Sequence, residues 1–355
     1  MKRLSKSMSS FIVPLLSILL AFMIGAIIMI ALGANPVTAV RYLFRGAFGT
    51  KSNFGTTLTK ATPLMFTALC ACFAYKCGVF NLGGEGQFLM GSIATFLVAY
   101  CSGITGFLAI LLSLVAGALA GGIWGAIPGV LKITRGQNEM IISIMLNYVA
   151  TLFMGVIYTN WLRDASVPQT LPVPDANKLP RIIPGMRFTW AFIIAVAVGL
   201  ILYYVLFWTS GGFKLRAVGY NMTASRFNGI PVHRYVLTSF IISGAIAGLG
   251  GGAELLGTQF RLINGFGAGY GFDGVAMALI GQLHPISTMV VALFFAALRV
   301  GSTTMQAATG VPTSVSDIIQ ALVIVFSVAG MALTRLPEFE AWKKRLLQKR
   351  KAGEA

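Results

Sequence analysis

Charged residues are scarce in this sequence of 355 residues. Only 10% are Asp, Glu, Lys or Arg, whereas soluble domains carry about 25%. Hydrophobic residues make up 56% of the chain, and the mean hydropathy is +0.81. The polar and apolar alternation of a lipid-facing barrel strand is also absent, and apolar runs of about 20 residues recur instead. These features exclude a soluble domain and predict an all-α polytopic membrane protein.

Motifs for catalysis and for nucleotide binding are missing as well. The sequence holds no Gly-Lys pair, so it has no P-loop and cannot bind ATP in the Walker manner. The only two histidines, His233 and His284, lie far apart, and no HExxH or Ser/His/Asp set stands out. The four cysteines lack the spacing of a zinc site or of a redox pair: Cys70, Cys72, Cys77 and Cys101. We therefore expect no enzyme activity, no bound cofactor and no metal.

Acidic residues are outnumbered by basic ones, 10 to 27, which gives a formal net charge of +17. In a soluble protein this excess would suggest nucleic acid as a partner. Here the basic residues lie mostly in loops and tails, where anionic lipid and membrane orientation explain them more simply. No nucleic-acid-binding module is recognisable, so we expect the lipid bilayer as a partner and no nucleic acid.

The apolar runs predict about ten spans within a single transmembrane domain over residues 1–355. An even number places both termini on one side, and the bias of basic residues makes that side cytoplasmic. The expected spans are residues 11–32, 61–77, 83–100, 104–131, 140–161, 188–208, 235–256, 270–283, 286–300 and 313–333. The expected connections are a cytoplasmic loop over 209–234, a proline-rich extracytoplasmic loop over 162–187 and a basic cytoplasmic tail over 334–355.

Two details of the spans follow from proline. Pro63 is expected in the first turn of its span, where proline is tolerated. His284-Pro285 separates two short segments, which we interpret as short or tilted helices that turn at the proline. Residues 37–60, with Arg41 and Arg45, are expected to form a polar loop.

Glycine recurs every four residues in two of the spans, and residues four apart share one face of a helix. Such a stripe lets another helix approach closely in lipid. We interpret both stripes as packing faces rather than ligand sites: Gly117, Gly121, Gly125 and Gly129 in one span, and Gly244, Gly248 and Gly252 in the other.

Polar side chains within spans are candidates for a translocation path. Glu85 lies among glycines, and a carboxylate near a membrane centre is costly unless it faces protein or water. It is either a path or hinge residue, or a helix-end residue that caps backbone amides. Four amide side chains are further candidates, although for any single one hydrogen bonding between helices is the more common explanation: Asn81, Gln87, Asn147 and Gln282. Arg299 is expected to extend its charged end toward the interface.

Two short motifs hint at internal repetition. VFNLG at 79–83 and GFDG at 271–274 both place a polar residue after phenylalanine and then glycine. The spans that precede them are expected to run in opposite directions, so a repeat would be inverted in topology, as is common in transporters.

The stretch from Leu215 to Leu256 joins a short basic connector to a glycine-striped span. A short helix from Met222 to Asn228 would present Phe227 as an apolar knob. An ordinary solvated loop is the alternative interpretation. A short cytoplasmic helix with a projecting apolar side chain would give a membrane subunit a contact surface for a cytoplasmic motor.

These residues carry a family likeness. LRAVGYNMTASRFNGIPVHRY followed by SGAIAGLGGG resembles the cytoplasmic loop and next helix of permease subunits of bacterial ABC importers, in the group that includes branched-chain amino acid and ribose permeases. GVFNLGGEGQFLMGS is similar to the signature of the nucleoside and simple-sugar branch. The likeness covers about residues 63–333. Met222 and Arg226 depart from the pattern, which leaves the details of partner choice open.

The resemblance implies a type II-like importer in the bacterial cytoplasmic membrane. Its other parts would be a cytoplasmic ATPase that binds ATP and Mg, a second permease that is commonly a different chain, and an extracytoplasmic binding protein or lipoprotein. The coupling helix that meets the ATPase would include Ala217, Gly219, Asn221, Ala224, Phe227, Asn228, Gly229 and Ile230. Residues 162–187 would face the binding protein, and residues 78–87 would lie near the path.

The leading hypothesis is the permease subunit of a nucleoside importer. The same role for a simple sugar such as ribose, or for branched-chain amino acids, is the nearest alternative, and only the second motif separates them. An ion-coupled secondary carrier is an alternative of another class. It needs intramembrane acidic or histidine sites, for which Glu85 is the one good candidate. A membrane scaffold without transport is disfavoured by the polar residues and broken segments within the spans.

Overall fold

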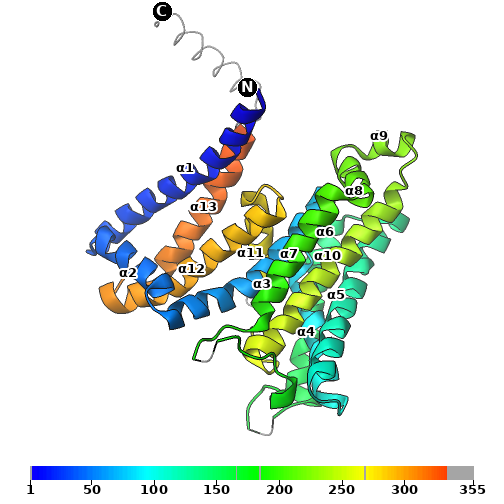
Figure 1. The fold of residues 1–355 in the computed structure, drawn as a ribbon, viewed down its shortest axis with the longest axis horizontal. Coiled ribbons are helices and arrows are strands. Elements are labelled where there is room, and N and C mark those ends of the chain that lie inside the picture. Colours follow the sequence, from blue (N-terminus) through cyan, green and yellow to red (C-terminus); the bar gives the residue numbers. More distant parts are fainter. Residues whose placement is uncertain (1, 165, 184, 268, 334–355) are drawn as a thin grey trace, which may run out of the picture. The chain divides into compact units, whose positions relative to one another are not determined.

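The fold is described from a computed structural model that covers residues 2–164, 166–183, 185–267 and 269–333; for residues 2–14 and 331–333 only the backbone is described. The basic tail expected over 334–355 lies outside these residues. Throughout the described residues the regular structure is helical (Figure 1). The α-helices are α1 (Lys2–Ala31), α2 (Pro36–Phe48), α3 (Lys51–Lys76), α4 (Gly84–Cys101), α5 (Phe107–Arg135), α6 (Glu139–Val156), α7 (Trp190–Trp208), α8 (Ser210–Tyr220), α9 (Met222–Phe227), α10 (Val232–Glu254), α11 (Tyr270–Ile280), α12 (Pro285–Thr309) and α13 (Thr313–Leu333).

The expected class, an all-α polytopic membrane protein, is confirmed. Among the described residues, seven helices are long and apolar enough to cross a membrane, and eight if α1 and α2, bent by 117°, form one span. The 18 residues of α4 would reach about 27 Å, but its first turn carries Glu85 and Gln87. The 11-residue α11 is shorter still. A total of ten therefore depends on α4 and α11 and stays a prediction.

The chain divides into two compact units, one of Met1–Gly46 with Gly301–Ala355 and one of Ala47–Val300. In the first unit α1 packs along α13. A Cβ added at Gly25 of α1 would lie 2.6 Å from the side chain of Ile319 of α13, so glycine permits this close approach. The second unit holds the candidate functional residues and is described below.

Residues 37–60 are helical, and the expectation of a polar loop there was wrong. Asn35 explains why α2 starts where it does, because its Oδ1 accepts hydrogen bonds from the amides of Val37 (3.0 Å) and Thr38 (3.3 Å). Pro36 follows as the first helical residue, a position at which proline costs nothing. Asn35 and Pro36 thus end one helix and start another.

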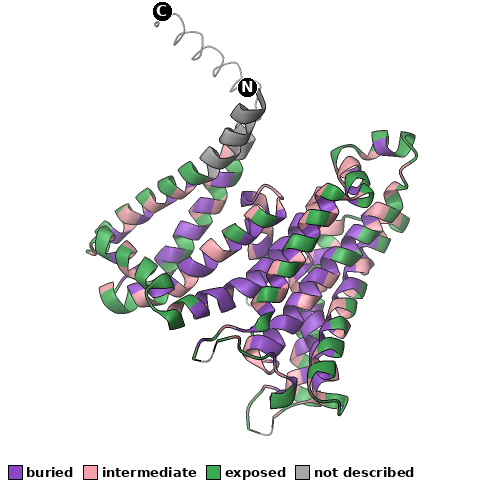
Figure 2. Cartoon of the chain, in the orientation of Figure 1, coloured by how far each residue is buried: buried purple, intermediate pink, exposed green. Residues whose placement is uncertain are grey.

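Helix α3 begins at Lys51, ten residues before the start expected from hydropathy at residue 61. Thr50 caps it by accepting a hydrogen bond from the amide of Asn53 (3.1 Å). Pro63 therefore lies inside the helix and not in its first turn, which corrects a second expectation. In the most apolar 18-residue window of α3, 94% of the residues are buried, and Figure 2 shows the buried residues of the central helices. The span over 61–77 was expected, and its earlier start was missed because polar residues, including Thr56, Thr57 and Thr59, lower the hydropathy of the first ten residues.

The turn at His284-Pro285 is confirmed, but only one of the two helices beside it is short. Helix α12 runs for 25 residues from Pro285 to Thr309, well beyond the expected end at residue 300. The turn itself is tight, with positive φ at Gln282 (56°) and Leu283 (55°). Arg299 of α12 pairs with Asp273 of α11, so it is held by an acidic partner instead of reaching alone toward the interface.

Glycines bring the backbones of α4, α5 and α10 together. A Cβ at Gly121 of α5 would lie 2.4 Å from the carbonyl oxygen of Gly244 of α10. A Cβ at Gly248 would lie 2.3 Å from the carbonyl oxygen of Gly117, and one at Gly91 of α4 would lie 2.2 Å from the Cα of Gly248. No side chain fits at such distances. The ends of the stripes differ, because Gly129 and Gly252 face side chains and not backbone.

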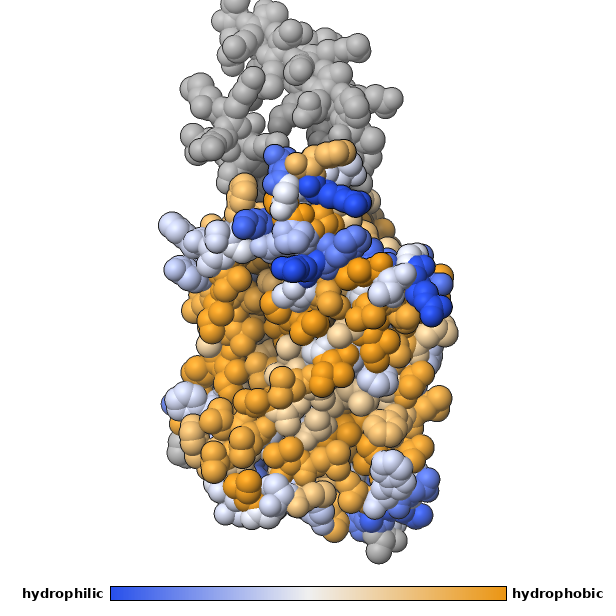
Figure 3. Space-filling view, turned by 90° about the vertical axis from the view of Figure 1, so that its right-hand side faces the viewer, coloured by the Kyte–Doolittle hydropathy of each residue, from blue (hydrophilic) through white to orange (hydrophobic). Residues whose placement is uncertain are grey.

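The second unit has two polar ends and an apolar middle. Figure 3 shows a broad band of hydrophobic side chains on one face, with hydrophilic residues above and below it. At one end lie α8 and α9, and Gly219 of α8 packs against the carbonyl of Lys76 at the end of α3. At the other end Asn177 donates hydrogen bonds to the carbonyls of Ala99 (2.7 Å) and Ile104 (3.0 Å). With its polar residues at the two ends and apolar side chains between them, the unit can cross a bilayer with the hydrophobic band facing lipid.

The contact between Gly121 and Gly244 predicts the effect of adding one methyl group. Gly121→Ala should lower the stability of the protein by about 1–3 kcal/mol, because the added carbon would overlap the carbonyl oxygen and push the helices apart. The measurement is the thermal unfolding midpoint of the purified chain in detergent.

Gly155→Ala is the matched control, because a Cβ at Gly155 of α6 meets nothing closer than the Tyr158 hydroxyl at 3.9 Å. Its helix should be as stable as before or slightly more stable. Equal midpoints for the two variants would contradict the proposed packing role of the stripes.

Candidate functional site

A short polar segment, residues 78–87, runs from the break after α3 into the first turn of α4, in the interior of the second unit. Asn81 and Gln87, both buried, bond to each other through both ends of their amides. Asn81 Nδ2 donates to Gln87 Oε1 (3.0 Å), and Gln87 Nε2 donates to Asn81 Oδ1 (3.0 Å). Asn81 Nδ2 also donates to the Ser243 hydroxyl of α10 (2.8 Å). The pair therefore fixes α10 against the polar segment.

Asn147 attaches α6 to the same segment. Its Oδ1 accepts a hydrogen bond from the amide of Gly86 (2.8 Å), and its Nδ2 donates to the carbonyl of Leu82 (2.9 Å). Gly86 has no room for a side chain here, because a Cβ would lie 2.9 Å from Asn147 Oδ1. Asn147 thus satisfies two backbone groups that no regular helix would satisfy.

Glu85 links α4 to α11. Its two carboxylate oxygens accept hydrogen bonds from the amides of Gly269 (3.1 Å) and Gly271 (2.6 Å), at the amino end of α11. A negative charge is favourable at this position, because the first amides of a helix have no partner within it. Glu85 therefore acts as a helix cap, one of the two interpretations that its sequence context allowed. Gly271 belongs to the second of the two repeat-like motifs, and Glu85 lies two residues after the first.

Four of the five residues expected along a path converge on the polar segment, and one does not. Asn81, Glu85, Gln87 and Asn147 all bond within or across it, whereas Gln282 stands in the turn between α11 and α12. None of the five lines either of the two cavities described below. Their polar groups serve helix-to-helix hydrogen bonds in this conformation.

The connector between α7 and α10 forms two helices, α8 and α9. Asn221 begins α9 by accepting a hydrogen bond from the amide of Ala224 (2.9 Å), and Gly229 with φ of 74° reverses the chain after it. The expected short helix over Met222–Asn228 is therefore present as Met222–Phe227. Phe227 is 89% exposed at its end. Tyr220, the last residue of α8, is 87% exposed as well, so the connector exposes two aromatic rings.

A cavity of about 710 Å³ lies between α8 and α9. Five of the residues expected in a coupling helix line it: Ala217, Asn221, Ala224, Asn228 and Ile230. Gly219 instead packs against Lys76, where a Cβ would lie 2.1 Å from the carbonyl oxygen. Phe227 and Gly229 stand outside the cavity. The connector thus combines a rigid base, a hollow and a projecting ring.

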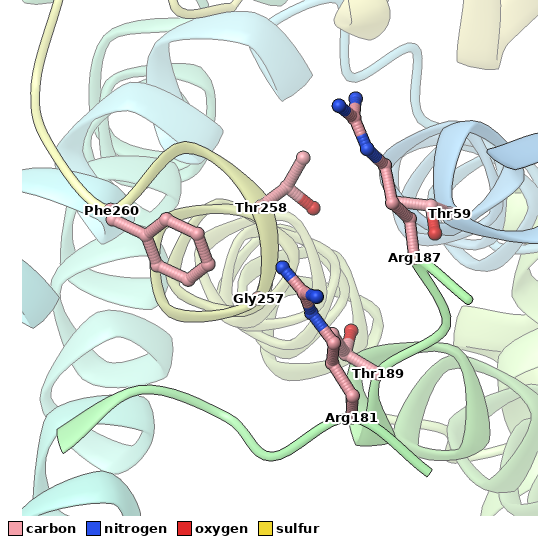
Figure 4. A pocket seen from close by; sticks show the side chains of 7 residues that line it. All are labelled: Thr59, Arg181, Arg187, Thr189, Gly257, Thr258 and Phe260. Atoms are coloured by element: carbon pink, nitrogen blue, oxygen red, sulfur yellow. The ribbon is translucent and has the colours of Figure 1, made fainter. Parts of the chain in front are cut away.

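A second cavity, of about 250 Å³, opens at the opposite end of the unit. Thr59 of α3, the turn after α10 and the insert 162–187 with the residues after it form its walls. Arg181 reaches toward Gly257 and Thr258, with Phe260 across the cavity (Figure 4). Arg187 and Thr189 complete the lining. The sequence analysis did not single out these residues, because the cavity joins positions that lie up to 200 residues apart.

The turn after α10 shapes that cavity. Residues Leu255–Gln259 form a single π-helical turn, and Phe260 follows with φ of 61°. The insert pairs with it through backbone hydrogen bonds from Leu179 to Leu256 (2.8 Å) and from Val173 to Phe260 (2.8 Å). Lys178 lies over the ring of Phe260, 4.7 Å from its centroid. The proline-rich insert is therefore held in place although it has little helix.

Among the described residues, no group of three or more His, Cys, Asp or Glu is placed to hold a metal ion. The cysteines of α3 and of the turn after it, Cys70, Cys72 and Cys77, are buried and free. Cys70 Sγ lies near Gln87 Oε1 at 3.7 Å. These thiols fill space around the polar segment.

Comparison with known proteins agrees with this architecture. Residues 53–328 match the family described as branched-chain amino acid transport system / permease component. No solved structure matches the chain significantly. The chain is 34% identical over 334 residues to the guanosine ABC transporter permease protein NupP of Bacillus subtilis. The aligned region covers 92% of this chain and 96% of that protein.

Two further relatives are similar over comparable lengths. The nucleoside ABC transporter permease protein NupB of Lactococcus lactis is 33% identical over 357 residues, or 97% of this chain and 98% of that protein. The glucose ABC transporter permease protein TsgB13 of Haloferax volcanii is 33% identical over 327 residues, or 89% and 86%. With a family match over most of its length and multiple apolar helices, the chain belongs to the permease components of the branched-chain amino acid transport system family.

Proposed function

We propose that this chain is the permease subunit of an ATP-driven importer for nucleosides. The observation that carries the proposal is its similarity to a guanosine permease and to a nucleoside permease over more than nine-tenths of their lengths. The polar segment 78–87 adds physical support. Non-helical backbone at membrane depth is tolerated only where protein buries it or where it lines a water-filled path. We place the path beside this segment, and conformational change would free its amides for a polar solute.

Two alternatives differ in solute or in energy source. A sugar importer is supported by the 33% identity to a glucose permease, and the family description itself names branched-chain amino acids. An ion-coupled carrier would need a carboxylate available to the coupling ion. Glu85, the candidate for that role, is already engaged by the amides of Gly269 and Gly271, so this alternative lacks its site.

Uptake of labelled guanosine by cells with and without this chain tests the solute. We expect uptake to depend on the chain and to be competed by excess guanosine or uridine, but not by ribose, glucose or leucine. Competition by ribose, glucose or leucine alone would reject the nucleoside assignment and keep the importer. Abolishing ATP hydrolysis while an ion gradient is maintained should stop uptake, and continued uptake would instead support the ion-coupled carrier.

The partners follow from the two ends of the second unit. We place α8 and α9 in the cytoplasm, with both termini on the same side, and a cytoplasmic ATPase against α9. An exposed aromatic beside a hollow is the form of an interface anchor. Lys214, Arg216, Arg226 and Arg234 lie in or next to this connector, in agreement with a cytoplasmic position. A second permease, of the same or a different sequence, completes the membrane part.

Phe227→Asp should uncouple transport. The loss of a buried aromatic anchor costs about 2 kcal/mol or more at an interface, or roughly a 30-fold weaker contact with the ATPase. We expect uptake by the reconstituted importer to fall accordingly, while membrane insertion stays unchanged. Phe107→Asp is the matched control, since Phe107 is 79% exposed at the other end of the unit. Normal uptake by the Phe227 variant would reject the coupling role.

At the opposite end we place an extracytoplasmic solute-binding protein or lipoprotein against the insert 162–187. The cavity with Arg181 and Arg187 supports this position, because two guanidinium groups at a rim attract an acidic surface on a partner. Hydroxyl groups of Thr59 and Thr258 lie in the same cavity and offer further hydrogen bonds.

Replacing both arginines, as Arg181→Gln with Arg187→Gln, should weaken binding of that partner by roughly three- to tenfold, with the difference shrinking at high salt. The measurement is the affinity of the binding protein for the importer in nanodiscs. Arg163→Gln, an exposed arginine of the same insert outside the cavity, should change the affinity by less than about twofold. Equal losses in both variants would show a diffuse charge effect and contradict a specific site.

A further inference from the structure

Three basic side chains surround one aromatic ring at the end of the unit that carries α8 and α9. Around the ring of Phe207, Arg216 Cζ lies 5.0 Å and Lys76 Nζ 5.7 Å from the centroid. The imidazole of His284 lies 5.3 Å away, centroid to centroid. Lys76 ends α3, Arg216 is on α8, and His284 is in the turn before α12. The fold therefore gathers these groups, which are far apart in sequence.

These three basic side chains form no ion pair with an acidic residue of the described part of the unit. The described part of Ala47–Val300 contains six acidic residues, and each one bonds elsewhere: Glu85, Glu139, Asp164, Asp175, Glu254 and Asp273. Arg216 Nε and His284 Nδ1 are buried and make no hydrogen bond. Lys76 and Arg216 are close enough for their charges to repel. The ring attracts each cation, but it carries no net charge and cannot cancel this repulsion.

The flanking aromatic residues place this group at the depth of lipid headgroups. Helix α7 begins at Trp190 and ends at Trp208, which are 48% and 70% exposed. Its 19 residues reach about 28 Å, close to the thickness of a bilayer core. Tryptophan and tyrosine favour the membrane interface, and Tyr204 on the next turn is 61% exposed. Phe207 precedes Trp208 directly and so lies at the same level.

We propose that Lys76, Arg216 and His284 bind the phosphate of an anionic phospholipid headgroup in the leaflet on the side of α8 and α9. The phosphate would supply the missing negative charge. Its oxygens would accept hydrogen bonds from the Lys76 ammonium, the terminal guanidinium nitrogens of Arg216 and Nε2 of His284, since all three side chains are partly exposed. Basic pockets between membrane helices on the cytoplasmic side recognise headgroups through this chemistry. The acyl chains would lie along the apolar face of α7, where Ile201 and Tyr204 are exposed. The site does not depend on which solute is transported.

The test is lipid retention by the full-length chain. The protein is purified from nanodiscs of phosphatidylcholine with phosphatidylglycerol, and bound lipid is measured by native mass spectrometry. We expect phosphatidylglycerol to be retained in preference to phosphatidylcholine. Arg216→Gln and Lys76→Gln should each reduce retention about fivefold. Inorganic phosphate should displace the lipid only weakly, whereas displacement at equal concentration would overturn a lipid site in favour of a free phosphate site.

Lys214→Gln is the matched control, because it removes the same charge from an exposed position on α8, two residues from Arg216. It should change retention by less than about twofold. Arg216→Lys keeps the charge and should retain more lipid than Arg216→Gln at an equal unfolding midpoint. Equal losses from Lys214 and Arg216 variants would overturn the proposal, as would equal retention of both lipids. If the partner ATPase raises the unfolding midpoint of the chain and anionic lipid does not, the three basic residues form a contact with the ATPase, and the lipid proposal is overturned.

Discussion

Satisfying polar backbone away from water is the constraint on which this structure depends. Between α3 and α4 the chain leaves helical geometry at residues 77–83, where few of its amides and carbonyls can form regular helical hydrogen bonds. Asn81, Gln87 and Asn147 supply side-chain partners, and Glu85 serves the open amides of α11. The break and the turn that follows it thereby connect three other helices, α6, α10 and α11. Backbone groups in this segment would cost free energy if they lacked hydrogen-bond partners. Because other helices supply or receive these bonds, the segment holds the unit together.

Close helix packing is the counterpart of these hydrogen bonds. Lipid offers no hydrophobic force between helices, so contact must come from shape and from backbone approach. Gly91, Gly121 and Gly248 provide it where α4, α5 and α10 cross. Each glycine in a helix lowers the stability of the helix by about 1 kcal/mol relative to alanine. The free energy gained from close helix packing must be larger than this loss. The polar segment leads directly into α4, so the glycine contacts and the hydrogen bonds position the same helix from its two sides.

Local patterns were readable from the sequence, and contacts between distant segments were not. The class, the glycine stripes and the helix that ends at Phe227 all follow from spacing or capping within a few residues. The early start of α3 was missed because its buried side chains include threonines and a proline, and burial by protein does not require high hydropathy. Asn35 is a cap signal that predicts α2 once Pro36 is counted as a first helical residue. The Arg181 cavity and the group around Phe207 depend on tertiary structure, since no local signal brings residue 76 to residue 284.

The two ends of the second unit differ in how their charges are compensated, and this difference separates their roles. At the end with the insert, Lys178 pairs with Asp175, and Arg181 lies beside the last turn of the π-helical segment. At the end with α8 and α9 the connector from residue 209 to 234 has no acidic residue at all. Basic residues without an acidic partner in the fold are balanced by water and salt ions, by anionic lipid or by a partner protein. The connector, which has no acidic residue of its own, therefore depends on its surroundings, and it is also where α9 projects beyond the membrane helices.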